Sequence, residues 1–573
     1  MRPLLENQTN PPSRPRRAGR ALLPARARRL GALLWLALLL PASCRYLPEG
    51  QVDLVRMPPL RSGSTSVVSP GGRPAAPPEE APDTEGPLAL MCPEAILLAL
   101  QNNRELAVER LNPLIRETFE EEQRAAFDPV LSAEAAWSRD AADGGSSTGG
   151  RTVTDTSSAR VGVEQFLPTG TTVGVEAGTE RAESSAVGGA AQTRLGLTVS
   201  QAILRGFGAE VNLVSLRQAR LDNVISSYEL RGFAEALVAS TENACWDCAL
   251  AEKQISIFED SLRLAQQQLA DTEDRIAVGT IAEVERAAAQ AEVALRKQDL
   301  IDARSGLATV RLQLLRLLNP PGSGLYEREV SIREDPQIPP VELEQVATHV
   351  QVALRMRPEI NQSRLGILRD DLEIVRTRNG LLPKLDLFIT LGKSGYADSF
   401  AGSVRDLGQD SYDVLLGLAF ERPIGNLAAR ARHSRAALNR RQAEEALANL
   451  QQLVQLDVRA AYIEVQRAQE QVTATAATRA FRAEALRAET EKFGVGKSTS
   501  FLVAQAQRDL VANQIAEVRA AVNYRKALVN LCRQDGTLLV RRGVAAPGEG
   551  PPGAVQPPES LPEEGTASAV PAP

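Results

Sequence analysis

The sequence contains two copies of one pattern, and this internal repeat constrains the fold more than any other feature. Residues 99–106 match residues 353–360 at an offset of 254 residues. Further along the chain, Phe207 matches Ile424 at an offset of 217 residues. The whole change in offset falls between Leu131 and Phe207, so the first copy has the longer segment there. The chain therefore has two halves that share one architecture.

Two long windows without proline predict the main element of each half. Residues 169–319 and 424–546 contain no proline and are rich in alanine, leucine, glutamine, glutamate and arginine, which favour helices. Residues 209–277 and 427–493 would each form a helix about 100 Å long. Because helices of this length are rare in globular domains, we expect them to pack as coiled coils.

The long helices are predicted to turn back as hairpins at two glycines. The turns are Val278-Gly279-Thr280 and Val495-Gly496-Lys497, which lie 217 residues apart. A glycine just beyond a helix favours the left-handed conformation that ends it, and the threonine or serine that follows can cap the next helix. Each half therefore contains one helical hairpin.

Short segments of alternating polarity precede each long helix. Residues 130–138, 194–203, 385–391 and 412–420 alternate in part, and residues 161–178 read as an additional hairpin. Such alternation is a weak signature of membrane β-barrel strands, and a soluble sheet is the alternative. If the helices that flank each insert lie on one side of a membrane, the number of strand crossings between them must be even. The second half then supplies two strands, and the first half supplies two or four.

The N-terminus has the pattern of a secretory signal. An arginine-rich start is followed by an apolar stretch at residues 30–40 and then by small residues, which predicts a signal peptide over residues 1–43. The segment that ends at Cys44 resembles a bacterial lipoprotein processing site, in which the cysteine becomes the lipidated first residue. Cleavage near Ala42 and Ser43 without lipidation is the alternative.

Two segments have compositions that do not favour a folded core. Residues 44–87 and 545–573 contain many proline and glycine residues. Segments of this kind bury too little apolar surface to offset the entropy of ordering the chain. We expect an N-terminal tether in the first segment and a disordered tail in the second.

The charge balance and the scarcity of histidine and cysteine exclude several functions. The net charge is −6, and without residues 1–43 it is −13, so the chain is a poor nucleic-acid binder. His349 and His433 lie far apart in the sequence and only five cysteines occur. The chain therefore has few side chains that could form a metal cluster or a histidine-centred triad. We therefore expect no enzyme activity, metal or cofactor. After residue 43, no apolar run approaches the ~18 residues of a membrane-spanning helix.

Two motifs suggest chemistry that their context does not support. Cys245 and Cys248 form a CxxC pair in the middle of a predicted helix, where packing is the expected role. Residues 494–499 look like half of a phosphate-binding loop, but Glu491 occupies the place of its first glycine and no strand precedes it. We expect a helical turn at that place instead.

Together these features resemble the TolC-like outer membrane efflux proteins over residues 88–540. The resemblance rests on an ordered set of weak motifs at residues 94–103, 129–131, 201–208 and 422–425 and at the two Val-Gly turns. It implies a mainly α fold with a membrane β-barrel part, in which long coiled-coil hairpins form a periplasmic tunnel and three chains share one barrel. It also divides the chain into a first repeat at residues 88–325 and a second at residues 326–544.

The resemblance implies the channel component of a tripartite efflux or type I secretion system, a passive duct in the bacterial outer membrane. The implied partners are a homotrimer, a periplasmic adaptor protein, an inner-membrane transporter, and outer-membrane lipid around a lipidated Cys44. The hairpin tips at residues 278–280 and 495–497 would contact the adaptor. Where the archetype has aspartates at its periplasmic gate, this chain has Leu502 and Gln505, so no acidic gate is expected. The alternative is a secreted coiled-coil structural or lipid-surface-binding protein without a pore.

Overall fold

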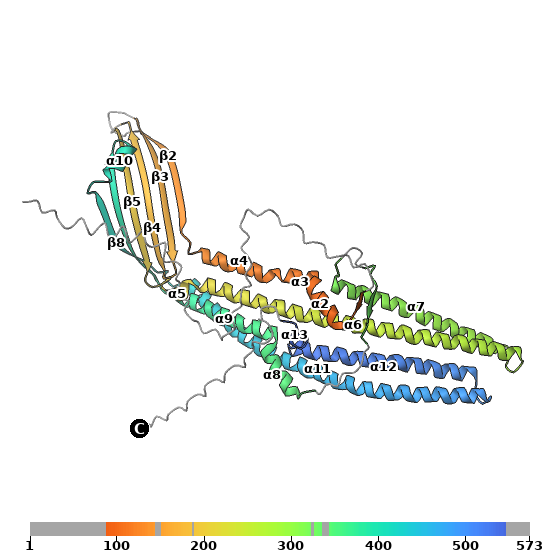
Figure 1. Cartoon of the computed structure of the whole chain (residues 1–573). Coiled ribbons are helices and arrows are strands. Elements are labelled where there is room, and N and C mark those ends of the chain that lie inside the picture. The colour runs from red at the N-terminus through yellow and green to blue at the C-terminus, as the bar shows by residue number, and fades with distance from the viewer. Residues whose placement is uncertain (1–87, 144–150, 186–187, 322–325, 335–342, 546–573) are drawn as a thin grey trace, which may run out of the picture. The chain divides into compact units, whose positions relative to one another are not determined.

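The computed structural model describes five stretches of the chain (Figure 1). They are residues 88–143, 151–185, 188–321, 326–334 and 343–545. The predicted signal peptide, the tether with Cys44 and the tail from residue 546 lie outside the described residues. Among the helices that are described, none is both long and apolar enough to cross a membrane.

Two long helical hairpins dominate the structure, as the proline-free windows predict. The first consists of α6 (Val214–Ala277, 64 residues) and α7 (Val284–Leu318, 35 residues). The second consists of α11 (Leu427–Gly494, 68 residues) and α12 (Ser500–Gln534, 35 residues). The predicted start of the first long helix is a separate turn, α5 (Ala209–Asn212). The two hairpins pack against each other through α6 and α12.

Shorter elements repeat around each hairpin. They are β1 (Leu88–Leu90), α2 (Cys92–Asn102), α3 (Arg104–Glu109), α4 (Leu111–Ala125), β6 (Val330–Ile332), α8 (Val346–Met356), α9 (Pro358–Asn379) and α13 (Leu538–Arg541). β1 and β6 pair in parallel. The layer next to the sheet runs α4, α6, α9 and α11, because each of these helices contacts the next. In each half the helix that precedes the strands therefore lies beside the long helix that follows them, and the two halves meet where α6 contacts α9.

All the remaining strands form one six-stranded antiparallel sheet. They are β2 (Val130–Asp143), β3 (Arg151–Leu167), β4 (Thr171–Ser184), β5 (Gly188–Ala202), β7 (Lys384–Ala397) and β8 (Tyr412–Glu421), in this order across the sheet. The sequence allows two or four strands in the first half, and the structure has four. β2 and β8 are edges with one neighbour each. The short helix α10 (Phe400–Asp406) packs on the sheet between β7 and β8 in sequence.

The strand register gives the sheet one apolar face and one polar face. One row that crosses all six strands is entirely aliphatic: Leu131, Val163, Val175, Leu197, Leu391 and Val414. The adjacent row is small or polar: Ser132, Gly162, Glu176, Gly196, Gly392 and Asp413. Because side chains alternate between faces along a strand, these rows lie on opposite faces. This two-faced alternation is typical of strands that separate lipid from water.

The cysteines of the CxxC pair pack inside the protein, as predicted. Cys245 and Cys248 are buried in α6 around Trp246, which is also buried, and Cys92 of α2 belongs to the same core. Cys532 is half-buried in α12. Burial raises the pKa of the Cys248 thiol to about 12, so the thiol stays protonated and behaves as a small apolar group.

A buried ion pair connects α6 to the end of α12. Arg231 Nε lies 3.3 Å from Glu235 Oε1, and the two side chains are only 7% and 5% exposed. Arg231 also donates from Nη2 to the backbone oxygen of Gly536 at 3.4 Å. Burial, aided by the nearby Glu359 and Asp535 carboxylates, raises the pKa of Glu235 to about 7 against the pull of Arg231. Glu235 therefore takes up its proton more readily in the folded protein than in the unfolded chain.

This pair predicts a pH-dependent stability. Glu235 titrates near 4.5 when unfolded and near 7 when folded, so its protonation favours folding below pH 4.5 and this contribution is lost as the pH rises to about 7. The loss amounts to about 3 kcal/mol. Glu235→Gln imitates the protonated acid and is expected to unfold at a higher temperature than the wild type at pH 8, but not at pH 5. The exposed Glu229→Gln on the same helix is the control. Identical pH profiles of thermal unfolding for wild type and Glu235→Gln would contradict the assignment.

Candidate functional site

The two hairpin turns come together at one end of the molecule (Figure 1). They line a shared groove of about 690 Å³. The first turn contributes Thr272, Asp274, Arg275, Val278, Thr280, Ile281 and Glu285, and the second contributes Phe493, Gly494, Gly496, Ser498, Thr499 and Ser500. The sheet joins the N-terminal ends of α6 and α11, whereas this groove lies at their C-terminal ends. The sheet and the groove are therefore separated by helices about 100 Å long.

Both turns adopt the same backbone conformation, which requires a positive φ angle that glycine adopts without strain. Gly279 and Gly496 have φ angles of 77° and 75°. Thr280 N donates to Arg275 O at 2.9 Å, and Lys497 N donates to Lys492 O at 2.8 Å. This six-to-one hydrogen bond with a left-handed glycine defines the Schellman motif at a helix end. The turns that the sequence predicts at both positions are confirmed.

A side-chain cap starts the helix after the second turn. Leu502 N donates to Thr499 Oγ1 at 3.4 Å, which satisfies one of the free amides of the first turn of α12. The equivalent helix α7 has no side-chain cap at Glu283. The predicted cap is therefore present in the second half and absent from the first.

Polar contacts lock the two hairpins side by side behind the turns. Ser500 donates a hydrogen bond to Glu285 across the groove. Deeper in the pair, Gln507 Nε2 lies 2.8 Å from Gln268 Oε1, and Arg508 Nη1 lies 3.1 Å from Glu292 Oε2. These contacts join α7 and α6 to α12, so the two turns are presented as one surface.

A cation–π contact closes the groove itself. The guanidinium carbon of Arg275 lies 5.1 Å from the centre of the Phe493 ring. Arg275 comes from the first hairpin and Phe493 from the second. The contact therefore ties the last turns of α6 and α11 together and adds about 0.5–1 kcal/mol at such an exposed place.

The tip surface exposes four large apolar side chains. Val278 is 79% exposed, Val284 80%, Val495 71% and Phe501 62%. Charged and polar residues of the groove surround them. Exposed apolar groups with a polar rim mark a protein-interaction surface. The Val-Gly turns in the sequence predict Val278 and Val495. Val284 and Phe501, which lie just beyond the turns and follow the same repeat, were not predicted.

The residues at the predicted gate level lie on an exposed face of α12. Leu502 is 43% exposed and Gln505 is also exposed, whereas Val503 between them is buried against the hairpin. Both side chains are therefore free to meet another chain or a lumen. Neither carries a charge, and their role in gating stays a prediction.

The residues singled out for chemistry lie at separate places in the structure. Residues 494–499 are the end and turn of a helical hairpin rather than a loop after a strand. His349 Nδ1 lies 3.1 Å from Asp535 Oδ2 in the protein interior, and His433 contacts Thr377 elsewhere. Within the described residues, no group of three or more His, Cys, Asp or Glu side chains could hold a metal ion.

The comparison with protein families gives one match. Residues 349–537 match the family described as outer membrane efflux protein. This segment contains most of α8 and all of α9, β7, α10, β8, α11 and α12. No curated protein sequence matches the chain.

Solved structures match nearly the whole described fold. The outer-membrane channel OprN is 16% identical with a TM-score of 0.59, covering 78% of this chain and 90% of its own. CusC is 17% identical with a TM-score of 0.59, covering 81% and 98%. The open state of the MtrE outer membrane channel of Neisseria gonorrhoeae is 18% identical with a TM-score of 0.58, covering 78% and 89%. At these identities the matches establish a common fold.

Proposed function

We propose that this chain is a member of the TolC-like outer membrane efflux protein family and forms the outer-membrane duct of a tripartite export system. One observation carries the proposal: a two-faced sheet with two unpaired edges is joined, in one chain, to two long hairpins whose turns form a single surface. The sheet suits a membrane, and the hairpins suit an aqueous compartment beside it. The chain itself needs no catalysis, because an inner-membrane transporter would supply the energy.

The sheet supports a barrel that several copies share. Unpaired strand edges are not tolerated in lipid, so β2 and β8 must find partners. Three copies in a ring would pair β2 of one protomer with β8 of the next. With six strands from each protomer, the barrel would have 18 strands, a size that leaves an aqueous channel. The apolar row through Leu197 would face lipid and the row through Glu176 would face the lumen.

The remaining regions take the roles that the family resemblance implies. Residues 1–43 would be removed as a signal peptide, and a lipid on Cys44 would anchor the tether to the outer membrane. The two repeats at residues 88–325 and 326–544 would build the tunnel wall, with residues 545–573 as a free tail.

The hairpin tips are proposed to receive a periplasmic adaptor protein. The residues that would contact it are Val278, Gly279, Thr280, Val495, Gly496 and Lys497. Their exposed apolar side chains and the groove between them support this assignment. Leu502 and Gln505, one to two turns further along α12, would line an uncharged periplasmic mouth.

Fractionation of expressing cells tests the proposal. We expect the protein in the outer-membrane fraction, and a trimer mass by light scattering in mild detergent. Cys44→Ala is expected to keep the trimer and to weaken membrane retention if the lipid contributes. A soluble or salt-extractable monomer would exclude the duct and leave a secreted coiled-coil scaffold as the explanation.

A further inference from the structure

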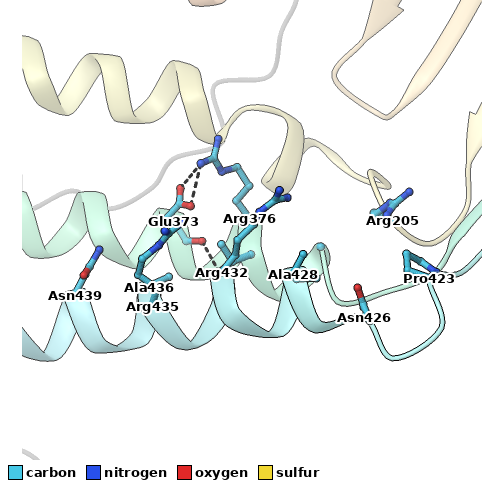
Figure 2. Close-up of a pocket in the computed structure, with 13 residues that line it drawn as sticks. Arg205, Glu373, Arg376, Pro423, Asn426, Ala428, Arg432, Arg435, Ala436 and Asn439 are labelled. Carbon is cyan, nitrogen blue, oxygen red and sulfur yellow. Dashed lines mark hydrogen bonds and ion pairs between the residues drawn. The ribbon is translucent and has the colours of Figure 1, made fainter.

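A groove rich in arginine lies where the sheet meets the helices (Figure 2). It has a volume of about 590 Å³ between the C-terminal part of α9, the first turns of α11 and the loop after β5. The charged residues that line it are Arg205, Glu373, Arg376, Arg432 and Arg435. Four positive charges and one negative charge thus face one groove. We call it the arginine groove.

The arginine groove has more positive charge than its own carboxylate neutralises. Glu373 is paired with Arg376 at 2.8 Å. Arg205 reaches only the rim carboxylate of Glu421, at 3.9 Å. Within the described part of the chain, Arg432 and Arg435 have neither an ion pair nor a hydrogen-bond partner. These two guanidinium groups project from successive turns of α11 and are available to an anion.

The start of α11 adds to the positive potential of the arginine groove. Asn426 at the N-cap position does not cap the helix, and its amide donates to Leu381 O at 3.2 Å instead. Ala428 and Ala429 of the first turn line the groove. The N-terminal end of a helix carries a partial positive charge from its free amides. This contribution supplements the arginines and does not define the site.

The position of the arginine groove next to the end of the sheet indicates which anion it would meet. The row of the apolar face nearest the helices contains Leu385 and Phe420, and one residue farther on β7 begins at Lys384 and β8 ends at Glu421. Pro423, two residues beyond the end of β8, already lines the groove. If the apolar face is embedded in the outer membrane, as the proposed function requires, the groove lies at the level of the periplasmic headgroups. Phosphate groups of lipids are concentrated at that level.

We propose that the arginine groove binds the phosphate of an anionic phospholipid from the periplasmic leaflet of the outer membrane. Arginine suits this ligand because its planar guanidinium can donate two parallel hydrogen bonds to phosphate oxygens. The unpaired Arg432 and Arg435 would make these contacts, and Arg205 would approach from the sheet side. The bound lipid would fix the depth at which each protomer meets the membrane. The inference rests on the proposed function only for the source of the phosphate.

The test compares lipid binding by full-length protein with and without the two free arginines. Detergent-purified protein is transferred to nanodiscs of phosphatidylcholine with or without phosphatidylglycerol, and bound lipid is counted by native mass spectrometry. Arg432→Gln/Arg435→Gln is expected to weaken phosphatidylglycerol binding about tenfold or more. Arg459→Gln/Arg487→Gln, which removes two exposed arginines farther along α11, is expected to bind like the wild type. Equal binding by both double variants would overturn the site.

A second arm separates lipid from free phosphate and from failure of the duct itself. Inorganic phosphate is titrated against the same proteins; binding of phosphate without retention of phosphatidylglycerol would overturn the lipid assignment. Trimer mass is read in the same experiment, so loss of the duct is distinguished from loss of the site. If the glutamine variant does not fold, phosphatidylglycerol binding is measured with Arg432→Lys/Arg435→Lys instead. Intermediate affinity supports bidentate recognition, and unchanged affinity contradicts it.

Discussion

Export is expected to fail when Gly496 is replaced by valine, although the channel still assembles. Gly496 has a φ of 75°, a conformation that costs an ordinary residue about 1–2 kcal/mol and a β-branched residue more. No atom lies within 4 Å of the position that a Cβ would occupy, so the strain stays within the turn. The turn would relax and displace Val495 and Lys497 from the proposed adaptor-docking surface. A penalty of this size weakens docking by about tenfold in each protomer.

Gly494 provides the matched control for this experiment. It is the last residue of α11, has open space around its Cβ position and lies in the helical region. Gly494→Ala therefore adds a methyl group without strain, and it is expected to export like the wild type. Export is measured as dye accumulation in cells without other channels of this kind, and assembly as trimer mass. Full export by Gly496→Val would exclude the second tip from the proposed adaptor-docking surface.

The helical part of the fold could be predicted closely because its signals are local. Proline-free windows and turn glycines placed α6 and α11 to within a few residues at most ends. The exception is the break at Leu213, where the chain changes from α5 to α6. No residue there has a strong helix-breaking tendency, so tertiary packing decides the break.

The strands were predicted to be too short because pairing, rather than sequence preference, determines their length. β5 begins at Gly188, six residues before the predicted start, in a glycine- and alanine-rich segment with low strand propensity. Its pairing with β4 from Ser184 to Thr171 holds that segment extended. β2 likewise continues to Asp143 because β3 lies beside it. A single sequence does not show which neighbour a strand will have.

The same distinction between local and long-range signals applies to the candidate sites. The turn glycines were predictable because the left-handed conformation is a property of one residue. Arg275 and Phe493 were not, since they become neighbours only when two hairpins 217 residues apart pack together. The arginine groove is similar: Arg205 and Arg432 come from different halves of the chain, and only the register of the sheet brings their segments to one rim.

Arginine at position 197 is expected to prevent stable insertion, whereas arginine at position 198 is expected to be tolerated. Leu197 lies between Val175 and Leu391 in the middle of the apolar face. Thr198, the next residue of β5, lies between Gly174 and Thr390 on the polar face. A charge facing the middle of the bilayer costs about 2–4 kcal/mol, and in a trimer the cost is incurred three times. A charge facing an aqueous lumen costs little.

The contrast between Leu197→Arg and Thr198→Arg separates the two readings of the sheet, because the variants differ by one position and introduce the same charge. Each is scored by its outer-membrane trimer fraction and by the temperature at which the trimer dissociates on a gel. If only Leu197→Arg lowers the trimer fraction and the dissociation temperature, the aliphatic row faces lipid. The sheet is then part of a membrane barrel, in which β2 and β8 must find partners. Equal tolerance of both variants would mean that water reaches both faces. The sheet would then belong to a secreted scaffold, and the hairpins to a coiled coil without a pore.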